Sequence, residues 1–352
     1  MKHIKSGFLT LNNNVRAITK MQFILVVILV IVAGVIGYYA GVWTAPKPPM
    51  LKEITIAYGA QTLSWGLTYV AKEKGIFEKY GLDARVIFLA GDTVVMPAVI
   101  AGSVDVGIGG LPIVASTRLK GEDVICIGIT NYVPKGTGVW ARPEIKSVQD
   151  LKGKVIAVPS IGGHIHSITR AALRILGVNP DEVKFIKMTY AEAYAALKEG
   201  KLDASYVSND YYLLCQRAGF NKLFEYGDIP ELRRVIWGTY YAKRSWVEAN
   251  KGTVVAFLKA IIEAVDVFKD MPEDEFLPIS EKYVGITDLE AIRVAVKNYG
   301  ATFAKDIRVV VSDAKYFIDM LTEFVPEYKD LDVNRMIENT YVEQAMKELG
   351  VT

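Results

Sequence analysis

Two stretches of similar pattern decide the fold: Glu78–Ile108, EKYGLDARVIFLAGDTVVMPAVIAGSVDVGI, and Arg174–Val207, RILGVNPDEVKFIKMTYAEAYAALKEGKLDASYV. Each stretch reads as a helix end, a glycine, a strand, a loop, a helix, a Gly-x-x-Asp turn and a second strand. Units of this kind are typical of α/β folds. Two copies predict two similar lobes, because a solenoid needs at least three stacked repeats. Asp105 and Asp203 are interpreted as turn and strand-entry residues.

The same alternation continues outside the repeats. From Glu53 to about Tyr241, short apolar runs such as Ile54–Tyr58 and Val124–Ile129 alternate with helical patterns. Beyond Lys243 only helical periodicity remains. The sequence therefore predicts α/β lobes followed by a helical C-terminal region that packs on the outside of one lobe.

Composition excludes several classes of protein. The 352 residues are 51% hydrophobic and 23% charged, which is enough for a large core without a disulfide or metal staple. Two cysteines rule out a disulfide framework, and three histidines leave little for a zinc cluster. The 41 basic and 39 acidic residues give a net charge of +2, and four of the basic residues precede the first apolar segment. We therefore expect no nucleic-acid partner.

One segment, Met21–Trp43, carries no charge and predicts a transmembrane anchor. As a helix it would span about 34 Å, enough to cross the hydrocarbon core of a bilayer. Residues 1–20 hold basic but no acidic side chains, so they are expected to stay cytoplasmic with the rest of the chain outside. No small-x-small site follows cleanly, which favours an uncleaved anchor. Arg16–Thr19 loosely resembles an archaeal pilin-like processing site, and this alternative stays open. Residues 44–52 form a proline-rich linker.

No strong catalytic motif is present. The sequence lacks G-x-S-x-G, H-E-x-x-H, C-x-x-C, a Walker A loop, and a G-x-G-x-x-G followed by an acid. We expect no catalytic residue, no metal and no cofactor, and a binding role in place of an enzymatic one. His164 and His166 are spaced i, i+2 but lack the further ligands that a metal site needs.

Five polar or glycine-containing loops follow predicted strands and lead into helices. Ligands of open α/β sheets bind at such positions, where free N–H groups and the positive end of a helix face the solute. Each side chain could instead cap a helix or pack in the core. The candidate ligand-binding residues are Gln61, Thr62, Ser64, Trp65, Asp92, Thr93, Gly110, Leu111, Ser160, Gly162, Gly163, His164, His166, Asn209, Asp210 and, as a stacking face, Trp237.

Three motifs carry a family resemblance. They are A-K-E-K-G-x-F-E-K-x-G-L-D at 71–83, A-G-x-V-D at 101–105, and S-V-Q-D-L-K-G-K-x-I-A-V-P at 147–159. The region from about Ile54 to Tyr241 resembles the substrate-binding proteins of nitrate, sulfonate and taurine ABC importers, a family that includes binding proteins for the pyrimidine precursor of thiamine.

The resemblance implies a type II periplasmic-binding-protein fold with two hinge strands, placed near Val139–Arg142 and Ile236–Tyr240. Lobe 1 would then comprise residues 53–140 and 237–352, and lobe 2 residues 141–236. Such proteins close over a small solute and deliver it to a permease driven by a separate ATPase. A monomer outside the cell membrane, periplasmic or extracellular, is expected.

The sequence leaves the solute open. Asp92 and Asp210 would suit an amine or aminopyrimidine, whereas the helix entrance at Gly162–Ser167 would suit an oxyanion. Both together would suit a zwitterion such as taurine. We predict a small polar or anionic solute of the sulfonate, taurine or nitrate type, with a thiamine-pyrimidine precursor or similar heterocycle as the alternative. An enzyme on the same fold is less supported, because the related pyrimidine-forming enzymes carry a cysteine-rich motif that is absent here.

Overall fold

The computed structural model describes residues 24–25, 27–35 and 51–351. The chain divides into two units, residues 1–50 and 51–352. In the first unit, residues 24–25 and 27–35 are helical with exposed side chains. Within the described part of the chain, no helix combines the length and apolar character needed to cross a membrane. The predicted tail, much of the anchor Met21–Trp43 and most of the linker lie outside the described residues.

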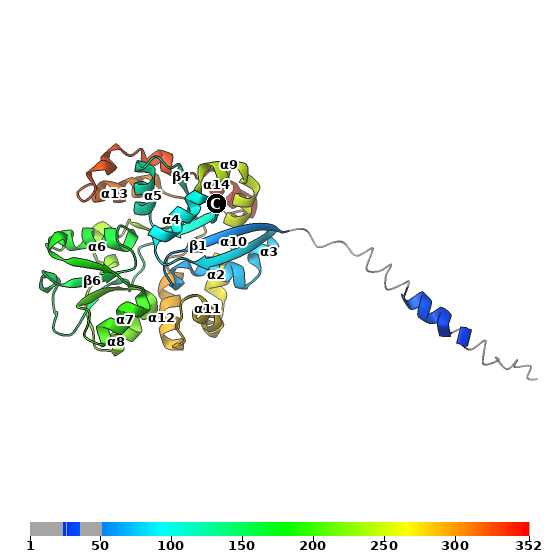
Figure 1. The fold of residues 1–352 in the computed structure, drawn as a ribbon, viewed down its shortest axis with the longest axis horizontal. Helices are drawn as coiled ribbons and strands as arrows, with labels where there is room; N and C mark the ends of the chain where they lie inside the picture. Colours follow the sequence, from blue (N-terminus) through cyan, green and yellow to red (C-terminus); the bar gives the residue numbers. More distant parts are fainter. Residues whose placement is uncertain (1–23, 26, 36–50, 352) are drawn as a thin grey trace, which may run out of the picture. The chain divides into compact units, whose positions relative to one another are not determined.

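Ten strands of the second unit form two five-stranded sheets, one for each lobe (Figure 1). The first sheet has the order β2 (Leu82–Phe88), β1 (Lys52–Tyr58), β3 (Val106–Gly109), β10 (Ile236–Lys243) and β4 (Val124–Tyr132). The second has the order β7 (Lys184–Lys187), β6 (Val155–Val158), β8 (Ala204–Val207), β5 (Gly138–Ala141) and β9 (Asn221–Glu225).

The two sheets share one topology. In each, the second strand, β1 or β6, pairs in parallel with both neighbours, as in the registers Ile56↔Val86 and Ile56↔Val106 of the first sheet. The fourth strand is antiparallel to both of its neighbours. That fourth strand, β10 or β5, always arrives from the other lobe. The repeat predicted from the sequence is therefore a structural repeat, and the two-lobed α/β architecture is confirmed.

Residues 133–137 and 226–235 carry the chain from one lobe to the other and back. The predicted hinge positions, Val139–Arg142 and Ile236–Tyr240, begin in the strands that follow these crossings, β5 and β10. Strands β5 and β10 each lie inside a sheet, where backbone hydrogen bonds pair them with a strand on either side.

Helices cover both sheets. In Figure 1, α4 and α5 lie on one side of the first sheet and α2 and α10 on the other, as right-handed crossovers require. The α-helices of the second unit are α2 (Gly66–Glu73), α3 (Ile76–Lys79), α4 (Asp92–Ala101), α5 (Leu111–Leu119), α6 (His164–Ile175), α7 (Tyr190–Lys198), α8 (Asn209–Arg217), α9 (Arg244–Ala249), α10 (Lys251–Asp270), α11 (Phe276–Tyr283), α12 (Leu289–Gly300), α13 (Val311–Leu321) and α14 (Thr340–Leu349). Short 3-10 helices are η1 (Leu63–Trp65), η2 (Val148–Leu151), η3 (Pro180–Glu182), η4 (Tyr226–Asp228), η5 (Pro230–Leu232), η6 (Glu273–Glu275), η7 (Pro326–Asp330) and η8 (Val333–Met336).

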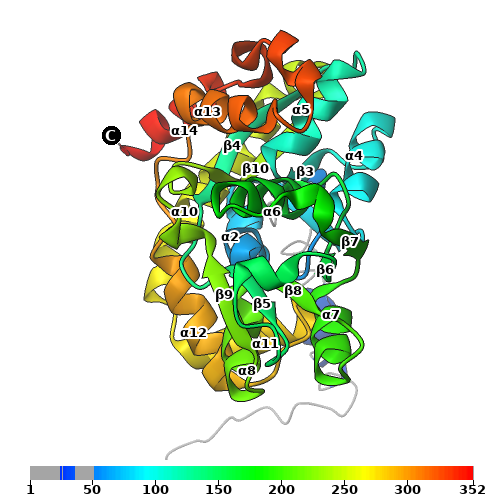
Figure 2. The same ribbon diagram turned by 90° about the vertical axis from the view of Figure 1, so that its left-hand side faces the viewer.

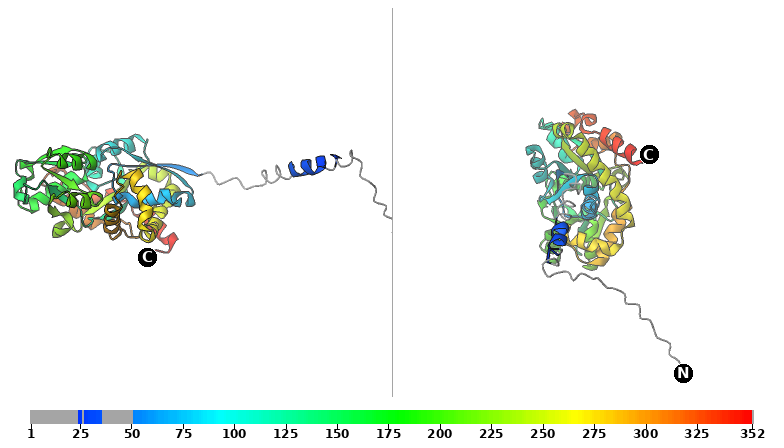
Figure 3. Two further views of the ribbon diagram at one scale, coloured as in Figure 1. Left: turned by 90° about the horizontal axis from the view of Figure 1, so that it is seen from below. Right: turned by 90° about the vertical axis from the view of Figure 1, so that its right-hand side faces the viewer.

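The helical C-terminal region does more than cover lobe 1. Helix α14 packs on α10 of lobe 1, away from lobe 2 (Figure 3). Helix α12, however, packs against α8 of lobe 2, and α13 lies beside both α5 and α6 (Figure 2). The C-terminal helices therefore contact both lobes.

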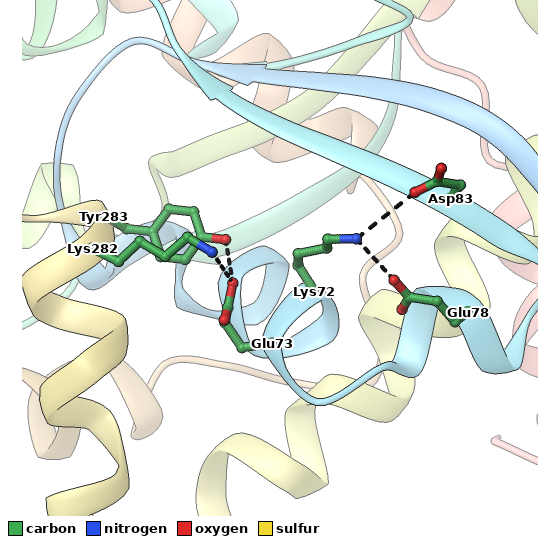
Figure 4. A network of polar contacts seen from close by, with 6 residues as sticks. All are labelled: Lys72, Glu73, Glu78, Asp83, Lys282 and Tyr283. Carbon is green, nitrogen blue, oxygen red and sulfur yellow. Dashed lines mark hydrogen bonds and ion pairs between the residues drawn. The ribbon is translucent and has the colours of Figure 1, made fainter.

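The charged residues of the motif at 71–83 form ion pairs and hydrogen bonds on the surface of lobe 1 (Figure 4). Lys72 pairs with Glu78 at 2.8 Å and lies 3.9 Å from Asp83. Glu73 accepts hydrogen bonds from Lys282 at 2.8 Å and from the Tyr283 hydroxyl at 2.6 Å, which fixes α11 on α2. This motif is a structural signature, and its charges lie outside the cleft described next.

The two Gly-x-x-Asp turns are equivalent as well. Asp105 accepts a hydrogen bond from the backbone N–H of Thr55 at 2.8 Å, next to β3 in lobe 1. Asp203 accepts one from the N–H of Val155 at 3.0 Å in lobe 2. Both carboxylates thus fix the entry to a central strand, which confirms the structural interpretation of the pair.

Candidate functional site

The helix N-termini that follow the parallel strands of both lobes meet in one cleft. It has two adjoining compartments, with about 410 Å³ and about 370 Å³ of space between atoms, openings to solvent included. The larger, the aromatic compartment, includes Trp65, Asp92, His164, Tyr206 and Trp237; the smaller, the lysine compartment, includes Gln61, Lys187, Thr189 and Tyr211. Gly59, Ala60, Gly91, Pro159 and Tyr190 line both.

Aromatic rings from both lobes build the aromatic compartment. The indole N–H of Trp65 donates to the carbonyl of Ala60 at 3.0 Å, which fixes its ring at the end of η1. Trp237 on β10 lies edge-on to the His164 ring, with 5.0 Å between centroids, and 6.2 Å from the Tyr206 ring. Rings held in this way offer flat faces to a ligand.

Asp92 supplies the carboxylate of this compartment. It opens α4, and its Oδ2 accepts a hydrogen bond from the N–H of His164 in the other lobe at 3.3 Å. Burial raises the pKa of Asp92 to about 6, and the His164 bond offsets part of that rise. None of the described residues that line the aromatic compartment is Lys or Arg. The carboxylate therefore lacks a cationic side-chain partner there, and a ligand donor would suit it.

Glycines allow the Asp92 carboxylate to lie against the backbone. A Cβ on Gly59 would lie 2.8 Å from the Asp92 nitrogen and 2.9 Å from Oδ1. One on Gly109 would lie 3.2 Å from Oδ1. Gly91, just before the helix, has φ of 107°, a conformation that side chains other than glycine rarely adopt.

His164 is a buried imidazole shared between the lobes. Its ring packs edge-on against Trp237 and Phe317, and neither ring nitrogen has a hydrogen-bond partner among the described residues. Burial lowers the pKa of His164 to about 3, so the ring is neutral at physiological pH. A Cβ on Gly110 would lie 2.4 Å from the imidazole Nδ1, so only a glycine leaves room for this ring.

Asp210 does not line either compartment and instead joins the lobes. From the start of α8, it accepts hydrogen bonds from the Thr62 hydroxyl at 2.6 Å and the Leu63 N–H at 2.9 Å. The Tyr299 hydroxyl donates to the same carboxylate at 3.3 Å. Burial raises the pKa of Asp210, and the bonds from Thr62 and Leu63 counter part of that rise. We call this group of residues the Asp210 latch.

Further contacts join the lobes near the start of α4. The hydroxyls of Thr93 and Ser160 lie 3.2 Å apart, and Lys187 donates to the carbonyl of Ala90 at 3.0 Å. Together with the Asp92–His164 bond, these contacts hold the lobes in a closed arrangement.

The structure brings half of the predicted residues to the lining of the cleft. Gln61, Thr62, Trp65, Asp92, Gly110, Ser160, His164 and Trp237 line its compartments. Gly163 and the helix-start residues Ser64, Thr93, Leu111, Asn209 and Asp210 are not among the lining residues. Gly162 and His166 line a separate pocket beside α6. A ligand-binding role for each residue stays a prediction.

Tyr190 and Tyr206 line the cleft but were not among the predicted ligand-binding residues. The sequence repeat could have indicated Tyr190. Tyr190 lies ten residues before Gly200, as Asp92 lies ten before Gly102 (200 − 190 = 102 − 92). Both residues begin the second helix of their repeat. Tyr190 is thus the residue of the second repeat that corresponds to the predicted residue Asp92 of the first. Tyr206 sits in mid-strand, where no loop pattern marks it.

Within the described residues, no group of three His, Cys, Asp or Glu side chains is placed to hold a metal. Cys126 and Cys215 are buried away from the cleft, and burial raises the pKa of each thiol to about 12. They are structural thiols.

Among proteins of known sequence, the chain is similar to several binding proteins. It is 27% identical over 264 residues to a binding protein of Brucella abortus, covering 72% of this chain and 78% of that one. It is 26% identical to an aliphatic sulfonates-binding protein of Escherichia coli, over 65% and 71% of the two chains. It is 22% identical to a formylaminopyrimidine-binding protein of Halalkalibacterium halodurans, over 58% and 63%.

Solved structures show the same fold. A protein of Bordetella bronchiseptica matches with a TM-score of 0.76 at 23% identity, over 85% of this chain and 98% of that one. The periplasmic nitrate-binding protein of Synechocystis matches with a TM-score of 0.73 at 16% identity, over 87% and 91%. The type II periplasmic-binding-protein fold expected from the sequence is confirmed.

An enzyme shares this fold too. A desulfurization enzyme matches with a TM-score of 0.57 at 14% identity, over 85% of this chain and 99% of that one. The fold alone therefore does not separate binding proteins from enzymes. The family model described as NMT1/THI5-like matches residues 64–275. This match spans more than half of the chain, and the family resemblance predicted from the sequence is confirmed: the chain belongs to the NMT1/THI5-like family.

Proposed function

We propose that this protein is the extracytoplasmic solute-binding component of an ABC importer, which captures a small organic solute by closing its lobes. The observation that carries the proposal is the cleft itself. Its walls come from both lobes, its polar groups include helix N-termini, the Asp92 carboxylate and the Lys187 ammonium, and the lobes contact each other across it. A cleft of this kind needs only ligand contacts that favour the closed state, and no catalytic group.

The aromatic compartment favours a flat heterocycle that carries hydrogen-bond donors. Trp65, Tyr206 and Trp237 offer ring faces, and Asp92 offers an acceptor without a side-chain cation beside it. An anion placed there would meet the carboxylate at close range, which costs Coulomb energy. The relative that binds formylaminopyrimidine supports this candidate.

The lysine compartment supports the second candidate, a sulfonate or nitrate. Lys187 supplies a cation, Gln61 an amide, and the start of α7 free N–H groups. The aliphatic sulfonates-binding relative supports it as well. A zwitterionic solute such as taurine would use both compartments.

Isothermal titration calorimetry on the full chain separates the candidates. Formylaminopyrimidine, taurine, hexanesulfonate and nitrate are titrated into the wild type, Asp92→Asn and the control Asp83→Asn, whose carboxylate lies on the outer surface. We expect heterocycle binding that Asp92→Asn weakens at least about tenfold, the order for a charge-assisted hydrogen bond. Sulfonate binding that is insensitive to Asp92→Asn would reject the heterocycle and keep the importer role. Turnover of a solute would overturn the importer role.

We also propose that residues 21–43 anchor the protein in the cell membrane with its C-terminal unit outside, next to an ABC permease and its ATPase. The uncharged segment and the basic residues before it support this orientation. Retention of the full chain in membranes after alkaline carbonate extraction, with residues 51–352 open to added protease in intact cells, is the expected result. Release of the chain by carbonate would contradict the anchor.

A further inference from the structure

A second pocket lies between α6 of lobe 2 and the end of α13, outside the cleft. We call it the α6–α13 pocket; it holds about 610 Å³ of space between atoms, its opening to solvent included, more than either cleft compartment. His166, Ser167 and Arg170 of α6 line one wall, and Leu321, Phe324 and Tyr328 line the other. Figure 2 shows the two helices at the junction of the lobes.

Arg170 gives this pocket a positive charge. Its guanidinium lies 4.7 Å from the centre of the Phe324 ring, and one terminal nitrogen pairs with Asp181 at 2.8 Å. Among the described residues, the buried Nε has no hydrogen-bond partner. None of the described residues that line the pocket is acidic. The ion pair with the exposed Asp181 therefore uses only part of the hydrogen-bonding capacity of Arg170. An anion in the pocket could bind the rest of the guanidinium.

His166 provides a neutral donor next to this cation. Its Nδ1 accepts a hydrogen bond from the N–H of Gly162 at 3.2 Å, which leaves the proton of the neutral ring on Nε2. Burial, and after it the positive charge of Arg170, lower the pKa of His166 to about 4, so the ring stays neutral at pH 7. The hydroxyls of Ser116 and Ser167 donate to backbone carbonyls within their own helices. Among the described residues, the Arg170 guanidinium outside its bond to Asp181 and the imidazole N–H of His166 are thus donors without a partner.

The opposite wall is apolar and fixed near the crossings between the lobes. Leu321, Phe324 and Val325 face the pocket. Helix α13 is held by Asp313, which accepts hydrogen bonds from Tyr132 at 2.9 Å and Arg234 at 2.6 Å, next to the two crossing segments. The pocket therefore has the donors Arg170 and His166 on the wall from lobe 2 and an apolar wall from the C-terminal region of lobe 1.

From this arrangement we propose that the α6–α13 pocket is a second ligand site, for a small organic anion with a flat apolar body. The carboxylate or sulfonate of such a ligand would meet Arg170 and His166, and its body would lie between Phe324 and Val325. The proposal does not depend on which solute the cleft takes.

Benzoate tests the proposal, with its neutral isostere benzamide as the control ligand. Each is titrated by calorimetry into the full chain in mild detergent. We expect saturable benzoate binding that Arg170→Gln weakens at least about tenfold, since a charge-assisted hydrogen bond to the anion is lost. Arg174→Gln is the matched control: Arg174 is one turn further along α6 and pairs with Glu323 at 2.6 Å, but it does not line the pocket. It should change benzoate affinity less than about twofold.

A second variant, Val325→Trp, tests the site independently in case Arg170→Gln does not fold. Val325→Trp fills the pocket without touching the charges and should abolish benzoate binding, while Asp92→Asn in the cleft should leave it unchanged. Benzamide binding as tightly as benzoate, no saturable benzoate binding, equal affinity in Arg170→Gln and wild type, or loss of binding in Asp92→Asn would each overturn the second site.

Discussion

At the scale of single residues, Asp92 links the chemistry of the cleft to pH. Its carboxylate is buried beside aromatic rings, and among the described residues the N–H of His164 across the cleft is its one donor. A buried carboxylate without a cation holds its proton to higher pH than an exposed one. The pKa of about 6 means that ionised Asp92 becomes the main form only near neutral pH.

We therefore predict that an amine-bearing solute binds more tightly as pH rises from 5 to 7, and that its affinity levels off above pH 7. The solute needs the ionised carboxylate, and between these pH values Asp92 loses its proton. Calorimetric titrations at pH 5, 6, 7 and 8 measure the effect. In Asp92→Asn the affinity should be weak and flat over the same range; a wild type without pH dependence would contradict the role of Asp92.

His164 should make the protein less stable in acid. The unfolded imidazole takes a proton near its ordinary pKa of 6.5, whereas the buried ring does so only near 3. The stability contributed by the neutral ring is thus present above pH 6.5 and is lost as pH falls towards 3. His166 acts in the same direction, with a pKa of about 4. Asp92 acts oppositely, because its raised pKa makes stability fall as pH rises from 3.8 to about 6.

Calorimetric melting at pH 7, 5.5 and 4 tests this expectation. His164→Phe keeps an aromatic ring between Trp237 and Phe317 but removes the titrating group. The variant should lose fewer degrees of Tm between pH 7 and pH 4 than the wild type. An equal loss in both proteins would show that His164 does not titrate on unfolding.

Residue roles were predictable from the sequence only where local pattern decides them. Asp92, Trp65 and His164 lie at the starts of the helical segments that come after strands β2, β1 and β6, and such positions reach the cleft in an open α/β sheet. Asp210 occupies the same kind of position, yet it binds Thr62 and Leu63 of the other lobe. Whether a loop carboxylate faces a solute or a second lobe depends on how the lobes close, and a linear pattern does not contain that geometry.

At the scale of elements, the junction of α2 and α11 shows how the helical C-terminal region is held. Tyr283 stacks on Tyr69 with 4.3 Å between ring centroids, and its hydroxyl donates to Glu73 (Figure 4). Lys282 reaches the same carboxylate, but 58% of its side chain is exposed. A half-buried hydrogen bond contributes more than an exposed ion pair, which water and salt screen.

We predict that Tyr283→Phe lowers the free energy of unfolding by about 1 kcal/mol, a fall in Tm of roughly 2 °C. Lys282→Met should change it by less than about 0.5 kcal/mol. Urea unfolding followed by circular dichroism measures both. A larger effect of Lys282→Met than of Tyr283→Phe would contradict this ranking.

Element types were largely predictable, and element partners were not. The apolar runs at Ile54–Tyr58 and Val124–Ile129 are strands β1 and β4, as periodicity predicted. That β10 inserts between β3 and β4 depends on pairing across more than a hundred residues of sequence, which local pattern does not report. Similarly, the helical C-terminal region was expected on one lobe, but α12 and α13 also contact lobe 2.

At the scale of the whole molecule, we expect the Asp210 latch to act on closure of the lobes more than on ligand choice. Its carboxylate lies outside the lining of both compartments but accepts three hydrogen bonds from lobe 1. Removing it should favour the open lobes before any solute binds. A smaller fraction of closed protein lowers the apparent affinity for every solute by the same factor.

We predict that Asp210→Ala weakens each solute that binds by about tenfold, from the lost hydrogen bonds to a charged group. The matched control is Asp203→Ala, whose carboxylate bonds within lobe 2 to Val155 and Arg142. This control should lower Tm but keep affinity within about twofold. Calorimetry and thermal melting on both variants check the pair, and solute-dependent losses in Asp210→Ala would assign that carboxylate to the ligand.

The position of β10 in its sheet has a consequence for synthesis of the chain. The five strands of the second sheet all lie between residues 138 and 225, so they are made before Ile236 leaves the ribosome. Until then β3 and β4 each expose an unpaired edge, because their shared neighbour does not yet exist. In a chain cut after Val235, limited proteolysis should leave lobe 2 intact and digest residues 51–132; survival of both would contradict this order. Strand β10 is made after lobe 2 but completes the first sheet. Until it is made, the unpaired edges of β3 and β4 must be kept from pairing with strands of another chain.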